Sequence, residues 1–393
     1  MQVCGVICEY NPFHKGHALH LERARRLSGA DYMVCVMSGL VVQRGAFARH
    51  DKWTRARMAL SCGADLVLEL PVRFACSPAP DFARGGVMLL DSLGVVTHLS
   101  FGCEGESLPH LEAAAKALSA ESAEFKDSLR DLLDQGLPYP RARALAAQQI
   151  SGLPGLSDVI ARPNAALALE YLNALPAHIV PVPVLREGGG YHDAHLAEFS
   201  SATAVRAALA QGDLCAALCA VPCPDLLRAA ETRGDFHTEE ALTQALLYRL
   251  RTISAEELSA ISGIDEGLEH RFLAAARKAA SREALLALVK SKRYTHARLS
   301  RAGMNALLGV TQAFADAHRI PTYARILGFR RDAQPLLHEI KRRSAIPLIT
   351  KAADYDDPLF ALDIRAQDLW SLGACAPSLR AAGRDYVTSP VVV

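Results

Sequence analysis

Residues 3–17 read VCGVICEYNPFHKGH, and this stretch decides the fold. Its opening residues, 3–8, are small or apolar, which predicts a buried β-strand. Asn11 and Pro12 predict a turn, and the pattern that follows predicts a helix over 17–27. A strand, a turn and a helix in this order are typical of the opening unit of a parallel α/β sheet.

The same alternation continues through the first two hundred residues. Apolar runs predict strands at 32–37, 66–70, 95–101 and 179–185, and Pro181 and Pro183 suit a strand at the sheet edge. Continuous apolar strands between helices predict a parallel sheet that is covered on both faces. Further helices are predicted at 51–62, 82–93, 165–175 and 201–210, with three more between 108 and 149.

Strand patterns fade after about residue 224, and the segments that follow have helical periodicity. These segments are 226–230, 239–252, 268–290, 297–308 and 313–317. A chain of 393 residues is long enough for two or three domains. We therefore expect an α/β protein with a Rossmann-like parallel-sheet domain over 1–220, followed by a mostly α-helical C-terminal domain over 221–393.

The composition narrows the classes of function. Half of the residues are hydrophobic, which suffices for globular cores, and the formal net charge is only +1. A chain this close to neutral has no bulk attraction for polyanions, so any RNA surface must come from local clusters. The first apolar run ends at Glu9, and no later run is long enough to span a bilayer. We expect a cytoplasmic protein without membrane contact, and the sequence indicates no protein partner.

The ten cysteines contain no CxxC pair and lie mostly in apolar runs, which favours buried, reduced thiols. Cys215, Cys219 and Cys223 are spaced to share one helix face, and three thiols could bind a metal ion. Pro222 interrupts that run and no histidine lies at ligand spacing, so we expect no metal site in the protein.

Two histidines lie where ligands bind in sheets of this kind, beyond the carboxyl end of the first strand. His14 and His17 are three residues apart at the entry to a helix, so both rings can point into one crevice. Gly16 would let a ligand approach the backbone, and the helix N-terminus attracts phosphate. Two imidazole donors there would stabilise the charge on an α-phosphate during adenylyl transfer. The alternative is a pair of histidines in an ordinary polar loop, which the position after the first strand disfavours.

This HxGH signature resembles that of the nucleotidyltransferase superfamily, and residues 5–17 resemble one branch of it, the bacterial tRNA(Met) cytidine acetate ligase family. The resemblance is collinear and covers nearly the whole chain. Its further blocks are 37–39 (MSG) with 42–45 (VQRG), 51–56 (DKWTRA), 63–71 (GADLVLELP), 101–104 (FGCE), 190–193 (GYHD), 263–269 (GIDEGLE) and 292–295 (KRYT).

The resemblance implies an enzyme that condenses acetate with ATP, accompanied by Mg²⁺, to acetyl-adenylate. It would then acetylate the exocyclic amine of the wobble cytidine in elongator tRNA(Met). His14 and His17 would be the catalytic pair. The ATP-binding residues would be Ile7, Cys8, Glu9, Tyr10, Asn11, Pro12, Phe13, His14, Lys15, Gly16, His17, Ala18, Leu19 and His20, with Gly102, Asn164, Arg186, Ser201, Thr203 and Arg206.

The last three of these residues belong to a stretch, 200–206 (SSATAVR), that resembles the second motif of the superfamily. Its hydroxyls and Arg206 would hold the leaving phosphates at the start of a helix. The alternative is a helix that Ser201 merely caps, with Arg206 in solvent. The chain departs from the family at Leu40, where members usually carry asparagine, so the resemblance predicts ATP use more directly than acyl preference.

Basic residues gather at two places in the C-terminal part, around residue 295 and at 341–343. Contacts with phosphates supply affinity that does not depend on sequence, and an aromatic ring such as that of Tyr294 can stack on an exposed base. The alternative is that these are solvated helix faces. The predicted RNA-binding residues are Lys290, Lys292, Arg293, Arg298 and Arg301.

Two other functions would share the first motif. One is a small-molecule adenylyltransferase that moves AMP to a phosphorylated metabolite, and the other is a module that binds nucleotide without catalysis. The sequence does not identify the group that deprotonates the cytidine amine. Asp51, Lys52 and Glu104 lie near strand ends, but nothing further singles them out.

Overall fold

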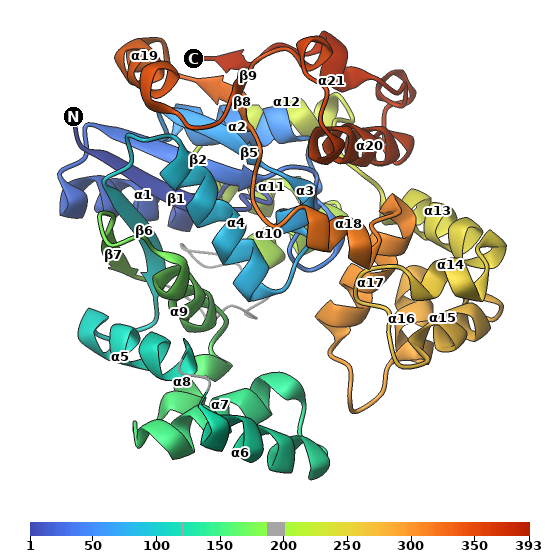
Figure 1. Ribbon diagram of the computed structural model, residues 1–393. Helices are drawn as coiled ribbons and strands as arrows, with labels where there is room; N and C mark the ends of the chain where they lie inside the picture. Colours follow the sequence, from blue (N-terminus) through green and yellow to red (C-terminus); the bar gives the residue numbers. More distant parts are fainter. Residues whose placement is uncertain (120–121, 187–200) are drawn as a thin grey trace.

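A computed structural model describes residues 1–119, 122–186 and 201–393, so the 190–193 block lies outside the described residues. A mixed sheet forms the centre of the molecule, in the strand order β10-β8-β5-β2-β1-β6-β7 with β9 beside β8 (Figure 1). Its strands are β1 (Val3–Cys8), β2 (Tyr32–Ser38), β5 (Leu66–Leu70), β6 (His98–Cys103), β7 (Val180–Leu185), β8 (Ala324–Phe329), β9 (Leu348–Ile349) and β10 (Val391–Val392), and a separate hairpin consists of β3 (Val41–Val42) and β4 (Ala46–Phe47).

Helices surround this sheet and extend from it. Those that precede residue 235 are α1 (Lys15–Ser28), α2 (Lys52–Ser61), α3 (Val72–Ala75), α4 (Ala79–Ser92), α5 (Leu108–Ser119), α6 (Ala123–Asp134), α7 (Tyr139–Ser151), α8 (Leu156–Ala161), α9 (Pro163–Ala174), α10 (Ala202–Ala210), α11 (Leu214–Cys219) and α12 (Pro224–Thr232). Those that follow are α13 (Glu239–Thr252), α14 (Ala255–Ser259), α15 (Leu268–Ala276), α16 (Arg282–Val289), α17 (His296–Leu308), α18 (Gln312–Ala317), α19 (Gln334–Arg343), α20 (Pro358–Leu372) and α21 (Arg384–Val387).

The predicted parallel α/β fold is confirmed. Strands β5, β2, β1, β6 and β7 are all parallel to their neighbours in this order, so their carboxyl ends meet at one edge of the sheet. The strand that contains Pro181 and Pro183 is β7, which lies at the end of the sheet as expected. A proline has no N–H to donate, and an edge strand needs donors on one side only.

The end of the chain returns to the same sheet, which the sequence analysis did not foresee. Strand β8 pairs antiparallel with β5, and β10 adds beyond it. Region 221–393 is mostly helical, as predicted, but residues from 324 onward cover the edge that β5 would otherwise expose. Local periodicity cannot reveal a pairing between strands so far apart in the chain. The division at residue 220 therefore stays a prediction.

A second difference concerns the predicted helix over 268–290, which is two helices, α15 and α16. The break falls at Ser281, whose side chain accepts a hydrogen bond from the Ala284 N–H at 3.1 Å. A serine at this position satisfies a free donor of the new helix and so favours a start there.

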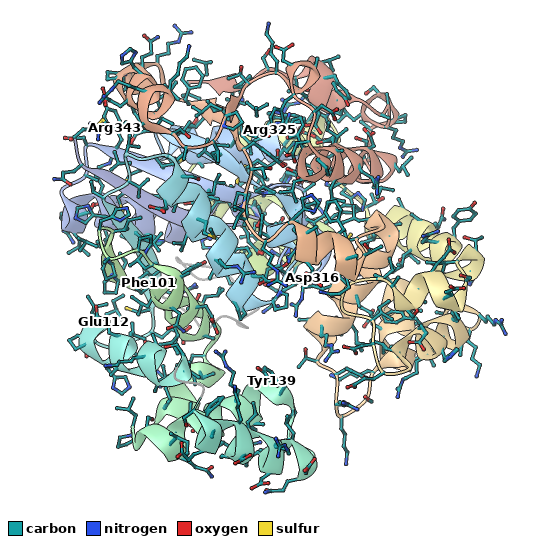
Figure 2. The ribbon with its side chains drawn as sticks, viewed as in Figure 1. Phe101, Glu112, Tyr139, Asp316, Arg325 and Arg343 are labelled. Carbon is teal, nitrogen blue, oxygen red and sulfur yellow. The ribbon has the colours of Figure 1, made fainter. Side chains whose placement is uncertain are left out.

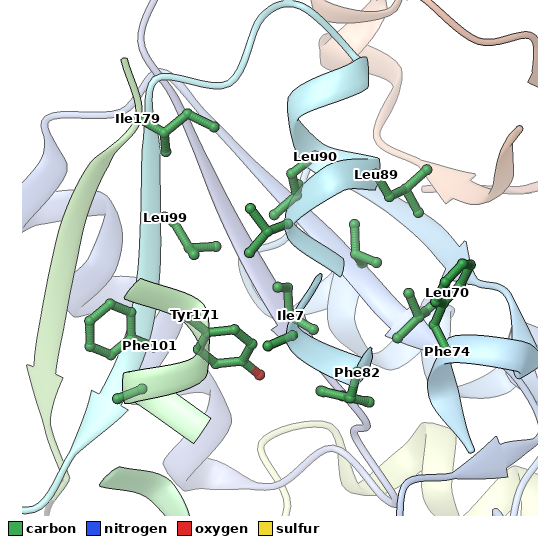
Figure 3. Close-up of a cluster of buried hydrophobic side chains, with 14 of the residues drawn as sticks. Ile7, Leu70, Phe74, Phe82, Leu89, Leu90, Leu99, Phe101, Tyr171 and Ile179 are labelled. Atoms are coloured by element: carbon green, nitrogen blue, oxygen red, sulfur yellow. The ribbon is translucent and has the colours of Figure 1, made fainter. Parts of the chain in front are cut away.

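Apolar cores lie on both faces of the sheet. Figure 3 shows part of the first, in which Ile7, Phe82, Leu90 and Tyr171 pack between the sheet and helices α4 and α9. A second core lies under α1, α2 and α10. Helices α13–α17 have a core of their own, centred on Phe272, and in Figure 1 they lie apart from helices α5–α8. No helix in the described ranges is both long and apolar enough to cross a membrane.

A buried ionic network joins the C-terminal segment to the sheet. Lys52, with no exposed side-chain surface, contacts Glu69 and Asp385 at 2.9 Å each. Arg325, on β8 and labelled in Figure 2, contacts Asp385 at 2.6 Å. Two cations facing two carboxylates keep each buried charge paired, which is the condition for tolerating such charges away from water.

Candidate active site

The loop after β1 brings the two predicted histidines together. The backbone turns at Tyr10 (φ 47°), and helix α1 begins at Lys15 with His14 as its N-cap. The His14 N–H donates to His17 Nδ1 at 3.2 Å, and the two rings stack with their centroids 3.6 Å apart. Because Nδ1 of a neutral His17 ring accepts this bond, its proton resides on Nε2, which is left as a donor.

Gly16 makes room for a neighbouring side chain. A Cβ on this residue would lie 3.0 Å from His14 Cε1 and 3.1 Å from its Nδ1. Glycine therefore leaves room for the His14 ring, which needs this space to stack on His17. The close approach of a ligand to the Gly16 backbone stays a prediction beside this packing constraint.

His14 is buried and His17 half-buried, and both are uncharged at neutral pH. Burial, with Arg186 and Arg206 nearby, lowers the pKa of His14 to about 3. Burial also lowers the pKa of His17 well below its usual range, and His14 Nδ1 has no hydrogen-bond partner among the described residues. A buried polar atom without a partner is uncommon in proteins, and it marks this ring as one that a ligand could satisfy.

These rings face a cavity of about 410 Å³ at the carboxyl ends of β1, β6 and β7. Most of the predicted nucleotide-binding residues line it. Pro12, Phe13, Lys15 and Ala18 are not among its described lining residues. Those that line it are Ile7, Cys8, Glu9, Tyr10, Asn11, His14, Gly16, His17, Leu19, His20, Gly102, Asn164, Arg186, Ser201, Thr203 and Arg206.

Two of these residues, together with Glu104, form one hydrogen-bonded wall. The Arg186 Nη1 donates to Asn164 Oδ1 at 2.9 Å, and the Asn164 amide donates to the Glu104 carboxylate. A Cβ on Gly102 would lie 3.2 Å from Arg186 Cγ, so glycine makes space for the arginine stem. Residues at the end of β6, on α9 and after β7 thus hold the Arg186 guanidinium at the side of the cavity.

Arg206, in the second motif, contacts the loop that carries His14 and His17. Ser201 caps α10 by accepting from the Ala204 N–H at 3.1 Å, as the alternative interpretation proposed. Arg206 nevertheless lines the cavity, where its Nη1 donates to the Asn11 carbonyl at 2.6 Å and its Nη2 to Thr203 Oγ1 at 3.2 Å. The arginine therefore fastens the start of α10 to the loop that carries the histidines.

A buried arginine holds that loop from beneath. The Arg55 guanidinium is fully buried on α2 and donates to the carbonyls of Glu9 at 2.6 Å, Ser38 at 3.0 Å and His50 at 3.1 Å, and also to that of Gly39. Burial lowers its pKa to about 10, so it stays charged at neutral pH. The DKWTRA block at 51–56 does not by itself indicate a role for Arg55, because the hydrogen-bond partners of the Arg55 side chain are backbone atoms from three other segments.

The β3–β4 hairpin forms another wall that the sequence analysis did not assign. The Gln43 N–H donates to Glu9 Oε1 at 2.7 Å, and the Arg49 N–H donates to Asn11 Oδ1 at 2.9 Å. On its far side, Ser300 donates to the Gly45 carbonyl at 3.0 Å. The hairpin thus connects the histidine loop to helix α17. Lining residues outside the predicted set also include Phe82, Leu167, Tyr171 and Glu239, whose positions in the sequence carry no polar motif.

The three residues considered as bases for the cytidine amine make other contacts. Asp51 caps α2 and contacts Arg384 at 2.8 Å, and Lys52 lies in the buried network described above. Glu104 accepts from Asn164, and none of the three is a described lining residue of the cavity. Leu40 is also outside the cavity lining, because it is buried in a core with Val41 and Trp370.

The predicted RNA-binding cations differ in their surroundings. Lys290 and Lys292 are exposed, whereas Arg293 contacts Glu266 and Arg298 contacts Asp265 at 2.7 Å. Arg301 points inward and donates to the Gln43 carbonyl at 3.3 Å. The ring suggested for base stacking, that of Tyr294, is only 6% exposed and lies under Arg298.

Metal-binding groups are not assembled in the described ranges, where no three His, Cys, Asp or Glu side chains gather. Cys215 and Cys219 are exposed thiols, and Cys223 is half-buried. Cys223 instead lies beside Cys62, and this neighbour lowers the pKa of the Cys62 thiol. The alternative of a three-thiol metal site therefore has no support from the geometry.

Comparison with known proteins agrees with this geometry. A family model for the HIGH nucleotidyl transferases matches residues 1–384. A tRNA(Met) cytidine acetate ligase of Acetivibrio thermocellus is 35% identical and that of Caldanaerobacter subterraneus 38% identical, covering 100% and 95% of both chains. A crystal structure of Thermotoga maritima TmcAL bound with alpha-thio ATP superimposes with a TM-score of 0.92 at 32% identity and full coverage of both chains. The chain therefore belongs to the HIGH nucleotidyl transferase family, and within it to the tRNA(Met) cytidine acetate ligases.

Proposed function

We propose that this protein is an ATP-dependent ligase that acetylates the exocyclic amine of the wobble cytidine in elongator tRNA(Met), in the cytoplasm. The observation that carries the proposal is the stacked, uncharged pair of His14 and His17 in a cavity that also holds Arg186 and Arg206. The relatives named above are tRNA(Met) cytidine acetate ligases, and one solved neighbour binds an ATP analogue.

The first step joins acetate to ATP. Acetate attacks the α-phosphate, charge develops on the phosphate oxygens, and pyrophosphate leaves. The N–H donors of His14 and His17 stabilise that charge, which is the type of contact that contributes most in such steps. Arg206 and the start of α10 line the same cavity, and we assign them to the leaving phosphates. The products are acetyl-adenylate and pyrophosphate.

Mg²⁺ enters this proposal as part of the nucleotide. The cavity offers the carboxylates of Glu9 and Glu239 among its described lining residues, and these do not form a cage of ligands. Mg²⁺ commonly binds through substrate phosphates with few protein ligands. The side chains therefore fit an ion carried by the triphosphate, and we assign no residue to hold it.

The test of the function is isotope exchange between ATP and pyrophosphate. We expect exchange that depends on acetate alone, followed by acetylation of a tRNA(Met) transcript when RNA is added. Exchange that requires a phosphorylated acceptor would instead identify a small-molecule adenylyltransferase. Binding of ATP without any exchange would identify a module that only binds nucleotide.

We further propose that region 221–393 binds the tRNA, through the junction of α16 and α17. Lys290 and Lys292 are exposed there, close in sequence to Arg293 and Arg298. Both arginines are partly neutralised by acidic neighbours, so the two lysines are the more available cations. Arg301 fastens α17 to the hairpin at the cavity, which links this surface to the proposed reaction site.

Reversing the charge of these lysines should weaken tRNA binding. In the double variant Lys290→Glu with Lys292→Glu, we expect a lower affinity and a salt dependence of binding whose slope falls by about two. The matched control reverses Lys116 and Lys126, two exposed lysines on α5 and α6. Equal affinities and slopes for the wild type and the first variant would exclude this surface.

A further inference from the structure

We propose that Glu9 is the proton acceptor in the second step, in which the cytidine amine attacks acetyl-adenylate. This inference rests on the proposed function and extends it to a residue whose chemical role is otherwise unassigned. Glu9 directly follows β1 and precedes the turn that leads to the histidine pair. It is half-buried and lines the cavity together with His14 and His17.

The position of Glu9 is held from two sides. Its backbone carbonyl accepts from Arg55 Nη1 at 2.6 Å, and its Oε1 accepts from the Gln43 N–H at 2.7 Å. Its Oε2 makes no hydrogen bond within the described residues. One carboxylate oxygen is thus fixed by the hairpin, and the other remains available to accept a proton. Such fixation is what a base needs, because a proton is transferred only over hydrogen-bond distance.

The other groups around the cavity are poorer acceptors. Its arginines are cations with no site for another proton. His14 and His17 are assigned to the α-phosphate as N–H donors, and the His20 ring contacts Ser100 Oγ at 3.0 Å. Glu239 is the other described carboxylate of the lining, but its side chain is 60% exposed and contacts Arg282 at 3.0 Å.

The chemistry of the second step requires an acceptor. The exocyclic nitrogen attacks the acetyl carbonyl carbon and forms the new N–C bond. One N–H proton passes to Oε2 of Glu9, while the C–O bond to the phosphate breaks and its electron pair leaves with AMP. The products are acetylcytidine, AMP and a protonated Glu9, which then releases its proton to water.

The variant Glu9→Gln separates this role from a structural one. The glutamine carbonyl can still accept from the Gln43 N–H, so the hairpin contact survives, but the amide cannot take up a proton. The probe for the first step is acetate-dependent ATP–pyrophosphate exchange. The probe for the second is single-turnover transfer from chemically prepared acetyl-adenylate to a tRNA(Met) transcript. Glu22→Gln, on the exposed side of α1, is the matched control.

In Glu9→Gln, we expect the rate of transfer to fall by about a hundredfold or more. The loss in the transfer rate should be at least about ten times the loss in the exchange rate. Parallel losses in both steps would overturn the proposal, since they would place Glu9 in ATP binding or loop structure. A transfer rate close to that of the wild type would also overturn the proposal. So would a Glu239→Gln variant that loses transfer much more than exchange while Glu9→Gln does not. Glu9→Ala, which removes the hairpin contact as well, should reduce exchange further than Glu9→Gln. A wild-type protein without acetate-dependent exchange would refute the proposed function itself.

Discussion

Replacing either His14 or His17 with alanine is expected to lower acetate-dependent ATP–pyrophosphate exchange by about a hundredfold or more, which is the typical cost of losing one transition-state donor. The two rings stack 3.6 Å apart and have lowered pKa values, so they act as neutral N–H donors whose geometry is already set. Removing either one also removes the ring that orients the other. The measurement is the initial exchange rate at saturating ATP and acetate, with kcat and KM determined separately.

The control for this experiment is His338→Ala, because His338 is exposed on α19 and outside the cavity lining. It should keep the wild-type rate. A thermal melt of each variant tests for loss of folding, and His14→Asn provides a polar replacement of smaller volume. A reduction below about threefold in both alanine variants would contradict the assigned role.

Replacing Arg55 with methionine is expected to lower the free energy of unfolding by about 3 to 5 kcal/mol, as is usual when one partner of a buried charged network is removed. Its guanidinium donates to four backbone carbonyls beneath the loop, and three of these hydrogen bonds are buried. Methionine fills a similar volume but leaves these carbonyls without donors. The measurement is urea denaturation followed by circular dichroism.

Arg57→Met is the matched control, since Arg57 lies two residues away on the same helix and is exposed. It should change the free energy of unfolding by no more than about 0.5 kcal/mol. Because Arg55 binds the carbonyl of Glu9, its loss should also raise the KM for ATP. Equal stabilities for the two variants would show that the buried guanidinium is not needed to hold the loop.

The parallel sheet and its order of strands and helices could be predicted because they depend on local patterns. Strand β1 spans the residues expected for it, and the histidines lie at the start of α1 as their spacing indicated. A prediction of this kind succeeds when burial on both faces makes a strand apolar throughout, and when a motif stands at a strand end.

Several features of the candidate site depended on contacts between distant segments. Gly16 and Gly102 line the cavity, and each also leaves room for a neighbouring side chain, His14 or Arg186. Arg301 looked like a surface cation, but it turns inward to a hairpin carbonyl. These contacts depend on which segments of the chain pack against each other. The chemical type of a residue does not determine which segments those are.

The amino-acid pattern alone predicted the parallel strands around β1, the place of the HxGH motif at their carboxyl ends and the family. The addition of the C-terminal strands beside β5, and the hold of Arg55 and the hairpin on Glu9, became visible in the folded chain. The two sets of features differ in the range over which the forces behind them act. Strand and helix preferences act over a few neighbouring residues, whereas sheet edges and buried charges are satisfied by any segment that the fold brings within hydrogen-bond distance.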